Sequence, residues 1–146
     1  MANYLCSVRT NYFHVKDEDK FREMMSQVYG CEDSVDLWQE TDNEGKTVFG
    51  FGCYGGISGV INAKEDENED VDETAFDEFI SGLQKCVADD DAIIIFEVGN
   101  EKLRYLVGSA TVITSKSIEY LNIQQLAIQL AQGLLDNDDW QTSCEY

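Results

Sequence analysis

Two segments of the chain have the pattern of β-hairpins, and this pattern restricts the fold more than any other feature. Strand-like runs at Ser34–Thr41 and Lys46–Tyr54 flank the turn sequence Asp42-Asn43-Glu44-Gly45. A second pair, Ala92–Val98 and Leu103–Thr114, flanks Gly99-Asn100-Glu101-Lys102 and is apolar enough to be central in a sheet. Because a short turn joins antiparallel neighbours, the two hairpins predict an antiparallel sheet.

Helical periodicity alternates with these strands. The β-branched and aromatic residues of Tyr4–Val15 predict an N-terminal strand. Apolar residues then recur at helical spacing in three segments. They are Phe21, Met24, Met25 and Val28 after Asp17, then Phe76, Phe79, Ile80, Leu83 and Val87, and finally Ile123, Leu126, Ala127, Leu130 and Leu134 after Asn122. We therefore expect one α+β domain over residues 1–146, with an antiparallel sheet of about five strands (the two hairpins plus the N-terminal strand) covered by three helices.

The charge of the chain is strongly negative. Its 29 Asp and Glu residues against 10 Lys and Arg give a formal net charge of −19. Nucleic acids and anionic membranes are themselves negative, so we expect no direct nucleic-acid binding and no membrane association. Hydrophobic residues make up 43% of the chain, which is enough for a core, so the charge is expected on the surface of a folded protein.

The sequence gives two indications of the cellular compartment. No basic leader with an apolar stretch opens it, and no window approaches the ~18 apolar residues of a membrane span, so we expect a cytoplasmic protein. The cysteines are odd in number and include no Cys-x-x-Cys pair, which favours reduced thiols over disulfides or a structural zinc site. These five are Cys6, Cys31, Cys53, Cys86 and Cys144.

The segment Gly50–Gly55 matches the pattern Gly-x-Gly-x-x-Gly and follows a predicted strand. A dinucleotide-binding loop must open a helix whose N-terminus meets the pyrophosphate, but the next residues, Gly56–Ile61, have no helical period. The sequence also has no lysine between Lys46 and Lys64. We therefore expect a tight turn or a bulged strand edge rather than a phosphate site.

A second motif resembles a calcium-binding loop. Carboxylate and amide side chains occupy positions 1, 3, 5, 7 and 12 of an EF-hand-like count, namely Asp66, Asn68, Asp70, Asp72 and Asp77. Val71 stands where the sharp turn needs glycine, and the preceding segment has the pattern of a strand. A dense carboxylate run generates such a match by chance, so we expect no cofactor and no dedicated metal site, with weak divalent-ion binding left open.

Catalytic constellations are not apparent in the sequence. His14 is the single histidine, and along one extended strand it lies more than ~20 Å from Cys6. Carboxylate pairs are too abundant to identify a catalytic pair. We therefore expect no enzymatic activity.

Clustering of the acidic residues is the remaining functional signal. They form four groups, Asp17–Glu23, Glu32–Glu44, Glu65–Glu78 and Asp136–Glu145, and a smaller cluster at Asp89-Asp90-Asp91. Two interpretations stay open: a solvated surface that keeps the protein soluble, and a surface that mimics the phosphates of a nucleic acid. In the second, a few aromatic residues would add selectivity.

The residues expected to bind a partner come from an acidic loop at 64–73, an acidic C-terminal tail at 137–146 and the regions around them. Their acidic members are Glu65, Asp66, Glu67, Glu69, Asp70, Asp72, Glu73, Asp89, Asp90, Asp91, Asp136, Asp138 and Asp139. Their aromatic members are Trp38, Tyr54 and Trp140.

Several segments resemble a family of small acidic proteins carried on bacterial mobile elements. They are the opening Met1–Asp17, the central Gly50–Gly55, Glu101–Tyr105 and Thr114–Lys116. In size and charge this family is similar to anti-restriction and anti-CRISPR inhibitors, several of which mimic DNA. The resemblance implies an inhibitor of a nucleic-acid-targeting defence protein but transfers no residue-level role.

Together these observations predict a non-enzymatic acidic inhibitor. Its expected partner is a basic nucleic-acid-binding protein, such as a nuclease or defence effector, which it would bind in competition with nucleic acid. One alternative is an immunity-type or regulatory protein that recognises its partner through a mixed apolar and acidic face, with the charge serving solubility. An ion-responsive acidic module is a third.

Overall fold

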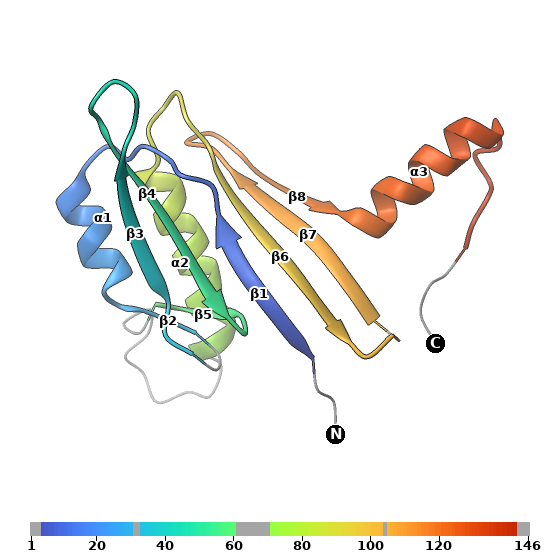
Figure 1. Ribbon diagram of the computed structural model, residues 1–146, viewed down its shortest axis with the longest axis horizontal. Helices are drawn as coiled ribbons and strands as arrows, with labels where there is room; N and C mark the ends of the chain where they lie inside the picture. Colours follow the sequence, from blue (N-terminus) through green and yellow to red (C-terminus); the bar gives the residue numbers. More distant parts are fainter. Residues whose placement is uncertain (1–3, 31–32, 61–70, 104, 143–146) are drawn as a thin grey trace.

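The computed structural model describes residues 4–30, 33–60, 71–103 and 105–142. Within these residues the chain has an α+β fold with three helices and a six-stranded antiparallel sheet of order β3-β4-β1-β6-β7-β8 (Figure 1). The strands of this sheet are β1 (Leu5–Thr10), β3 (Asp36–Thr41), β4 (Thr47–Tyr54), β6 (Ile93–Glu101), β7 (Tyr105–Ile113) and β8 (Ile118–Asn122). Consecutive strands β3–β4, β6–β7 and β7–β8 are hairpins, and β1 joins the two halves of the sheet.

The predicted fold class and the two predicted hairpins are confirmed, but the strand count is wrong. β8 adds a sixth strand to the main sheet, and a second, two-stranded sheet pairs β2 (Val28–Gly30) with β5 (Ile57–Val60). Val28, expected on the first helix, belongs to β2, where its side chain still packs against the core. An apolar residue at the end of a helical pattern fits either element, so the pattern could not separate them.

The expectation of a turn or bulged edge at Gly50–Gly55 is also wrong for most of this segment. Gly50 and Gly52 lie in β4, a regular strand paired on both sides. The chain turns after β4, where Gly55 has a φ of 87°. The two strand glycines therefore have a packing role, described below.

One face of the main sheet holds the hydrophobic core. The helices α1 (Glu18–Met25) and α2 (Val71–Cys86) lie against this face, which we call the core face (Figure 1). Its centre consists of five phenylalanines that are 0% exposed, with neighbouring ring centroids 4.9–6.2 Å apart. They are Phe13, Phe21, Phe49, Phe51 and Phe79. Aromatic burial on this scale dominates the stability of a small domain.

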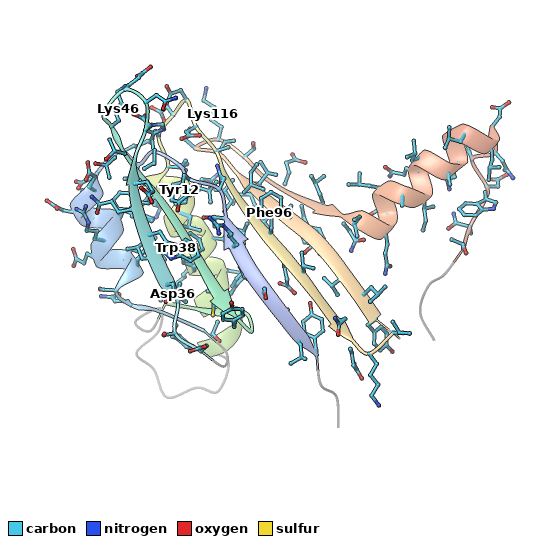
Figure 2. The ribbon with its side chains drawn as sticks, in the orientation of Figure 1. Tyr12, Asp36, Trp38, Lys46, Phe96 and Lys116 are labelled. Carbon is cyan, nitrogen blue, oxygen red and sulfur yellow. The ribbon has the colours of Figure 1, made fainter. Side chains whose placement is uncertain are left out.

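We call the opposite side of the sheet the open face. Successive residues of a strand point to opposite faces, so the open face carries the residues that alternate with those of the core face. Aromatic rings cover the two glycines of β4 on this face. A Cβ atom on Gly50 would lie 3.4 Å from the ring of Tyr12, and one on Gly52 would lie 2.8 Å from the ring of Trp38. Figure 2 shows Tyr12, Trp38 and Phe96 along the open face. The glycines thus make room for two aromatic side chains.

The third helix, α3 (Ile123–Leu135), lies outside this two-layer arrangement. Asn122 is both the last residue of β8 and the N-cap of α3, and its side chain accepts hydrogen bonds from the backbone N–H groups of Gln124 and Gln125 at 2.9 and 3.3 Å. The helix then runs away from the sheet, and none of its residues is buried (Figure 1). The expectation that three helices cover the sheet is therefore wrong for α3.

Candidate acidic binding surface

Helix α1, the edge strand β3 and the turn from β3 to β4 lie along one side of the molecule (Figure 1) and are rich in carboxylates. Between residues 17 and 45 the described part of the chain has nine carboxylates and two basic residues. We call these nine the acidic edge: Asp17, Glu18, Asp19, Glu23, Asp33, Asp36, Glu40, Asp42 and Glu44. The local charge of this edge is therefore strongly negative.

Two of the three acidic residues of helix α1, and the acidic residue before it, lie at the N-terminal end, where they stabilise the helix. The side chain of Asp17 accepts a hydrogen bond from the Lys20 backbone N–H at 3.1 Å and caps the helix, while Glu18 and Asp19 occupy the first turn. Negative charge there interacts favourably with the helix dipole and with the unpaired N–H groups. The same residues thus begin the helix and charge its surface.

Arg22 holds α1 beside β3. Its Nη2 atom donates a hydrogen bond to Gln39 Oε1 at 2.7 Å, and its guanidinium carbon lies 5.1 Å from the centroid of the Phe49 ring. The same nitrogen lies 3.5 Å from Glu18 Oε1. One of the two basic residues of this region is therefore committed to contacts within the protein.

An aromatic side chain stands between two carboxylates on the open face of β3. Asp36, Trp38 and Glu40 alternate with residues of the core face and so point to the same side. The guanidinium carbon of Arg9 lies 4.9 Å from the Trp38 ring centroid and stacks on it. This combination of a fixed indole ring and flanking carboxylates suits recognition of a cationic side chain.

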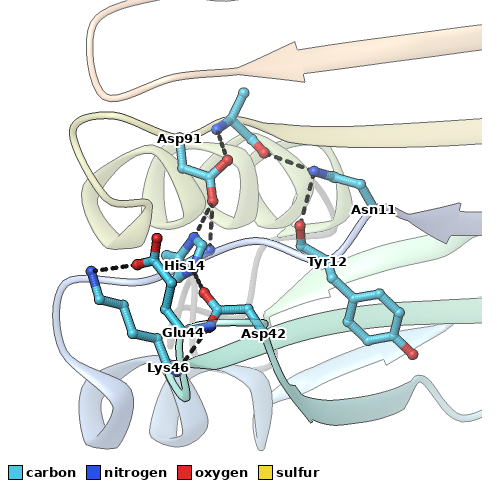
Figure 3. A network of polar contacts seen from close by, with 8 residues as sticks. Asn11, Tyr12, His14, Asp42, Glu44, Lys46 and Asp91 are labelled. Atoms are coloured by element: carbon cyan, nitrogen blue, oxygen red, sulfur yellow. Dashed lines mark hydrogen bonds and ion pairs between the residues drawn. The ribbon is translucent and has the colours of Figure 1, made fainter.

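His14 links three separate segments at one end of the acidic edge (Figure 3). Its Nε2 atom lies 2.7 Å from Asp42 Oδ2 in the β3–β4 turn, and its Nδ1 atom lies 2.8 Å from Asp91 Oδ2 just before β6. The His14 backbone N–H also donates to Asp91 Oδ2 at 2.8 Å. We call this arrangement the histidine clamp, because it ties both turns to the chain between β1 and α1.

Both ring nitrogens of His14 face carboxylate oxygens, an arrangement that the imidazolium satisfies because it donates from both. Hydrogen bonds to Asp42 and Asp91 raise the pKa of His14. The hydrogen bond from His14, and those from the Lys46 and Glu44 backbone N–H groups, lower the pKa of Asp42 to about 2. Burial raises the pKa of Asp91, but hydrogen bonds from the His14 backbone, the His14 ring and the Ala92 N–H outweigh it and lower the pKa overall.

A groove of about 790 Å³ opens beside the histidine clamp. Its charged lining residues are Glu18, Asp42, Glu44, Asp90 and Lys46, together with His14. Lys46 Nζ lies 3.7 Å from Glu44 Oε2. The lining thus has four carboxylates and two positive groups, the Lys46 ammonium and the His14 imidazolium. A groove of this charge attracts a lysine or arginine side chain rather than an anion.

The structure brings some of the predicted binding residues together. Asp89, Asp90 and Asp91 lie in the connection from α2 to β6, which the histidine clamp joins to the turn of the acidic edge. Asp89 Oδ1 is paired with Lys16 Nζ at 3.1 Å. Trp38 and Tyr54 share the open face, where Tyr54 is 72% exposed.

The remaining predicted residues lie elsewhere or outside the described residues. Trp140, Asp138 and Asp139 follow α3, and Asp136 is its C-cap with a φ of 52°, at the other end of the molecule from the acidic edge (Figure 1). Glu65, Asp66, Glu67, Glu69 and Asp70, the centre of the predicted acidic loop, lie outside the described residues, as does most of the EF-hand-like segment. Asp72 and Glu73 lie in the first turn of α2, but their side chains are outside the description.

Sequence reasoning missed the roles of His14 and Asp42. Asp42 does carry a turn signal, because its Oδ1 atom accepts hydrogen bonds from the Glu44 and Lys46 backbone N–H groups at 2.9 and 2.8 Å, as expected of Asp at the start of a tight turn. Nothing in the sequence indicates that a histidine 28 residues earlier meets it.

No protein-family model matches the chain, and neither a search of curated proteins nor one of solved structures finds a match. Among the described helices, none has the length and apolar character needed to cross a membrane. The described residues also contain no group of three His, Cys, Asp or Glu side chains able to hold a metal ion.

Proposed function

We propose that this protein is a non-enzymatic inhibitor that binds the basic, nucleic-acid-recognising surface of a bacterial defence protein and competes there with nucleic acid, in the manner of anti-restriction or anti-CRISPR proteins. The observation that carries the proposal is the acidic edge, where nine described carboxylates stand against Lys20 and Arg22. A surface of this charge attracts the Lys and Arg clusters with which such proteins hold phosphates.

Fixed charges support this function better than mobile ones would. Arg22, the Asp17 cap and the histidine clamp hold α1, β3 and the turn in defined positions, so little conformational entropy is lost when a partner binds. Long-range attraction between opposite charges also accelerates association and makes it sensitive to salt.

The test begins with the full chain, immobilised and exposed to a bacterial lysate, followed by elution with NaCl from about 0.15 to 1 M. The proposal predicts that basic nucleic-acid-binding proteins elute within the gradient and that added duplex DNA or RNA displaces them. Retention of all captured proteins at 1 M salt, or no displacement by nucleic acid, contradicts competition for a nucleic-acid site.

Two charge-neutralised variants then locate the contact. The first neutralises the acidic edge by Asp19→Asn, Glu23→Gln, Asp36→Asn and Glu40→Gln. Its matched control, Asp77→Asn, Glu78→Gln, Glu101→Gln and Glu119→Gln, removes four charges away from that edge and outside the predicted binding residues, so both chains change from −19 to −15. At roughly 0.2–1 kcal/mol for each lost surface pair, the four changes amount to about 1–4 kcal/mol, so we expect roughly fivefold to several hundredfold weaker binding for the first variant and little change for the control. Equal effects would mean that only net charge matters.

A third variant addresses the acidic loop. It replaces Glu65, Asp66, Glu67, Glu69 and Asp70 by the corresponding amides. If inhibition survives both this change and neutralisation of the acidic edge while each variant remains folded, the proposed function is wrong.

The Asp36–Trp38–Glu40 triplet favours one alternative, an immunity-type or regulatory module that binds through a mixed apolar and acidic face. Such binding would persist at high salt and would be lost in Trp38→Ala rather than in the charge-neutralised variants. The salt gradient above therefore separates the two functions.

A further inference from the structure

The helix α3 presents an apolar surface that the rest of the described chain does not cover. Its 13 residues include no charged side chain and none is buried, although charged residues make up 27% of the whole sequence. Five of its six large apolar side chains are between 47% and 79% exposed: Ile123, Leu126, Leu130, Leu134 and Leu135. An amphipathic helix with its apolar side in water lacks the packing that normally stabilises a helix in a protein.

The open face of β6 and β7 is also apolar and exposed. Its residues are uncharged, namely Ile94, Phe96, Val98 and Asn100 on β6 with Leu106, Gly108, Ala110 and Val112 on β7. Phe96 is 46% exposed, Val98 64% and Leu106 53%. Helices α1 and α2 cover the opposite face, so within residues 4–30, 33–60, 71–103 and 105–142 this part of the open face is an apolar sheet surface with no helix layer.

Geometry prevents α3 from covering this surface in its own chain. Because Asn122 both ends β8 and caps α3, no loop is available to reverse the chain. The first turn approaches β7, where a Cβ on Gly108 would lie 2.8 Å from Ile123 Cγ2, and the helix then diverges. A groove of about 810 Å³ remains between them, lined on the sheet side by Val98 and Leu106 and on the helix side by Ala127 and Ala131.

We propose that the protein forms a two-fold symmetric homodimer in which α3 of each copy packs into this groove and over the open face of β6 and β7 of the other copy. The same chain thus exposes an apolar helix surface and an apolar sheet surface. In a two-fold symmetric dimer, α3 of each copy covers the sheet surface of the other, so the same contact forms twice. The absence of charge on both surfaces is the composition expected at the core of such an interface.

The exposed apolar area agrees with this occupant. Leu121 on the neighbouring β8 lies opposite Ala110 and so shares the open face. The exposed fractions of the five α3 residues and of Phe96, Val98, Leu106 and Leu121 amount to about five whole side chains. At roughly 100 Å² each, that is about 500 Å² per copy. A standard interface buries about 800 Å² per partner, roughly 60–65% of it apolar, which is again about 500 Å².

The test measures the mass of the full chain by sedimentation velocity and light scattering between about 1 and 100 µM. The proposal predicts a species of twice 16.5 kDa. Leu130→Glu on α3 and Val98→Glu on β6 should each weaken dimerisation by roughly hundredfold or more, because each places two carboxylates in the apolar contact. Gln129→Glu is the matched control: it introduces the same side chain on the glutamine-lined side of α3, beside Gln125 and Gln132, and should leave the dimer intact.

Mixing the two disruptive variants tests the exchange itself. The Leu130→Glu chain retains a normal sheet surface and the Val98→Glu chain a normal helix, so a mixed dimer keeps one of its two contacts. We expect differently tagged copies of the two variants to associate with each other more tightly than either does with itself. Added salt should strengthen the dimer by screening the repulsion of two chains of charge −19, which is opposite to the salt effect on the proposed inhibitor–target complex.

A chain that stays at 16.5 kDa up to 100 µM overturns the proposal and leaves the apolar surface to a different protein. A dimer that survives both Leu130→Glu and Val98→Glu overturns it as well, because its interface then lies elsewhere. The melting temperature of each variant, measured alongside, verifies that it is folded.

Discussion

Replacing Gly52 by alanine tests why the sequence has a glycine in the middle of a regular strand. A Cβ at this position would lie 2.8 Å from Trp38 Cη2 and 2.8 Å from the carbonyl oxygen of Val8. The indole ring can move away, but the Val8 carbonyl belongs to the backbone of β1, which pairs with β4 at this register, so the strands must separate locally. Such overpacking costs about 1–3 kcal/mol, and the lower backbone entropy of alanine returns roughly 0.5–1 kcal/mol.

We therefore expect Gly52→Ala to lower the free energy of unfolding by about 1–2 kcal/mol, or the melting temperature by about 3–8 °C. Circular dichroism during urea and thermal unfolding measures this loss. In a Trp140→Phe background, Trp38 is the single remaining tryptophan and its fluorescence reports the displaced ring. Gly133→Ala is the control, because an added Cβ there meets nothing within 4 Å and alanine favours the helix by about 0.5–1 kcal/mol.

The outcome also separates the two contacts. In the double variant Trp38→Ala/Gly52→Ala, only the backbone contact with Val8 remains, so part of the destabilisation should persist beyond that of Trp38→Ala. If Gly52→Ala is as stable as the natural chain and the Trp38 emission is unchanged, then the close approach of β1, β4 and Trp38 does not explain this glycine.

Two further predictions concern the clamp and the core. Folding raises the pKa of His14, so the stability that His14 contributes is complete below pH 6.5 and is lost as the pH rises through the raised value. Folding lowers the pKa of Asp42 to about 2, so the stability that Asp42 contributes is present above about pH 4 and is lost on acidification. We therefore expect the melting temperature of His14→Gln to lie furthest below that of the natural chain between about pH 4.5 and 6.5, and the two melting temperatures to converge at higher pH. A difference in melting temperature that does not depend on pH would refute the charged histidine clamp. Phe51→Ala should cost about 3–5 kcal/mol in urea unfolding, because Phe51 is 0% exposed and its ring meets those of Phe13 and Phe79 edge-on; a loss under 1 kcal/mol would contradict its central place in the core.

Local patterns predicted the elements whose signals lie within a few residues. The turn sequences predicted both hairpins, and helical spacing predicted α1, α2 and α3. Strand β8 escaped prediction because it is short, although it forms a hairpin with the preceding β7. The strands of the β2–β5 pair are shorter still, and each takes its hydrogen bonds from a strand that only the fold brings near. A prediction based on local sequence has no access to those partners.

The candidate binding surface also has properties that the sequence predicts and properties that only the fold determines. Its negative charge follows from composition, and the acidic groups at Asp17–Glu23 and Glu32–Glu44 are visible in the sequence. Their union into one acidic edge depends on Arg22 reaching Gln39, and the clamp depends on His14 meeting Asp42 and Asp91, which are 28 and 77 residues away. Such distant pairings depend on strand order and register, which nearby residues do not specify.

By itself, the sequence determined the fold class, the hairpins, the three helices and a strongly negative net charge, because turn chemistry, periodicity and net charge are local or additive properties. Only the tertiary structure decided which face of the sheet is covered. The helical pattern of α3 predicts an apolar side but not what that side contacts, and the fold directs it away from the sheet of its own chain. Burial is a relation between distant segments, so the sequence predicts that an apolar side needs covering. Only the positions of the other described elements show that none of them covers it.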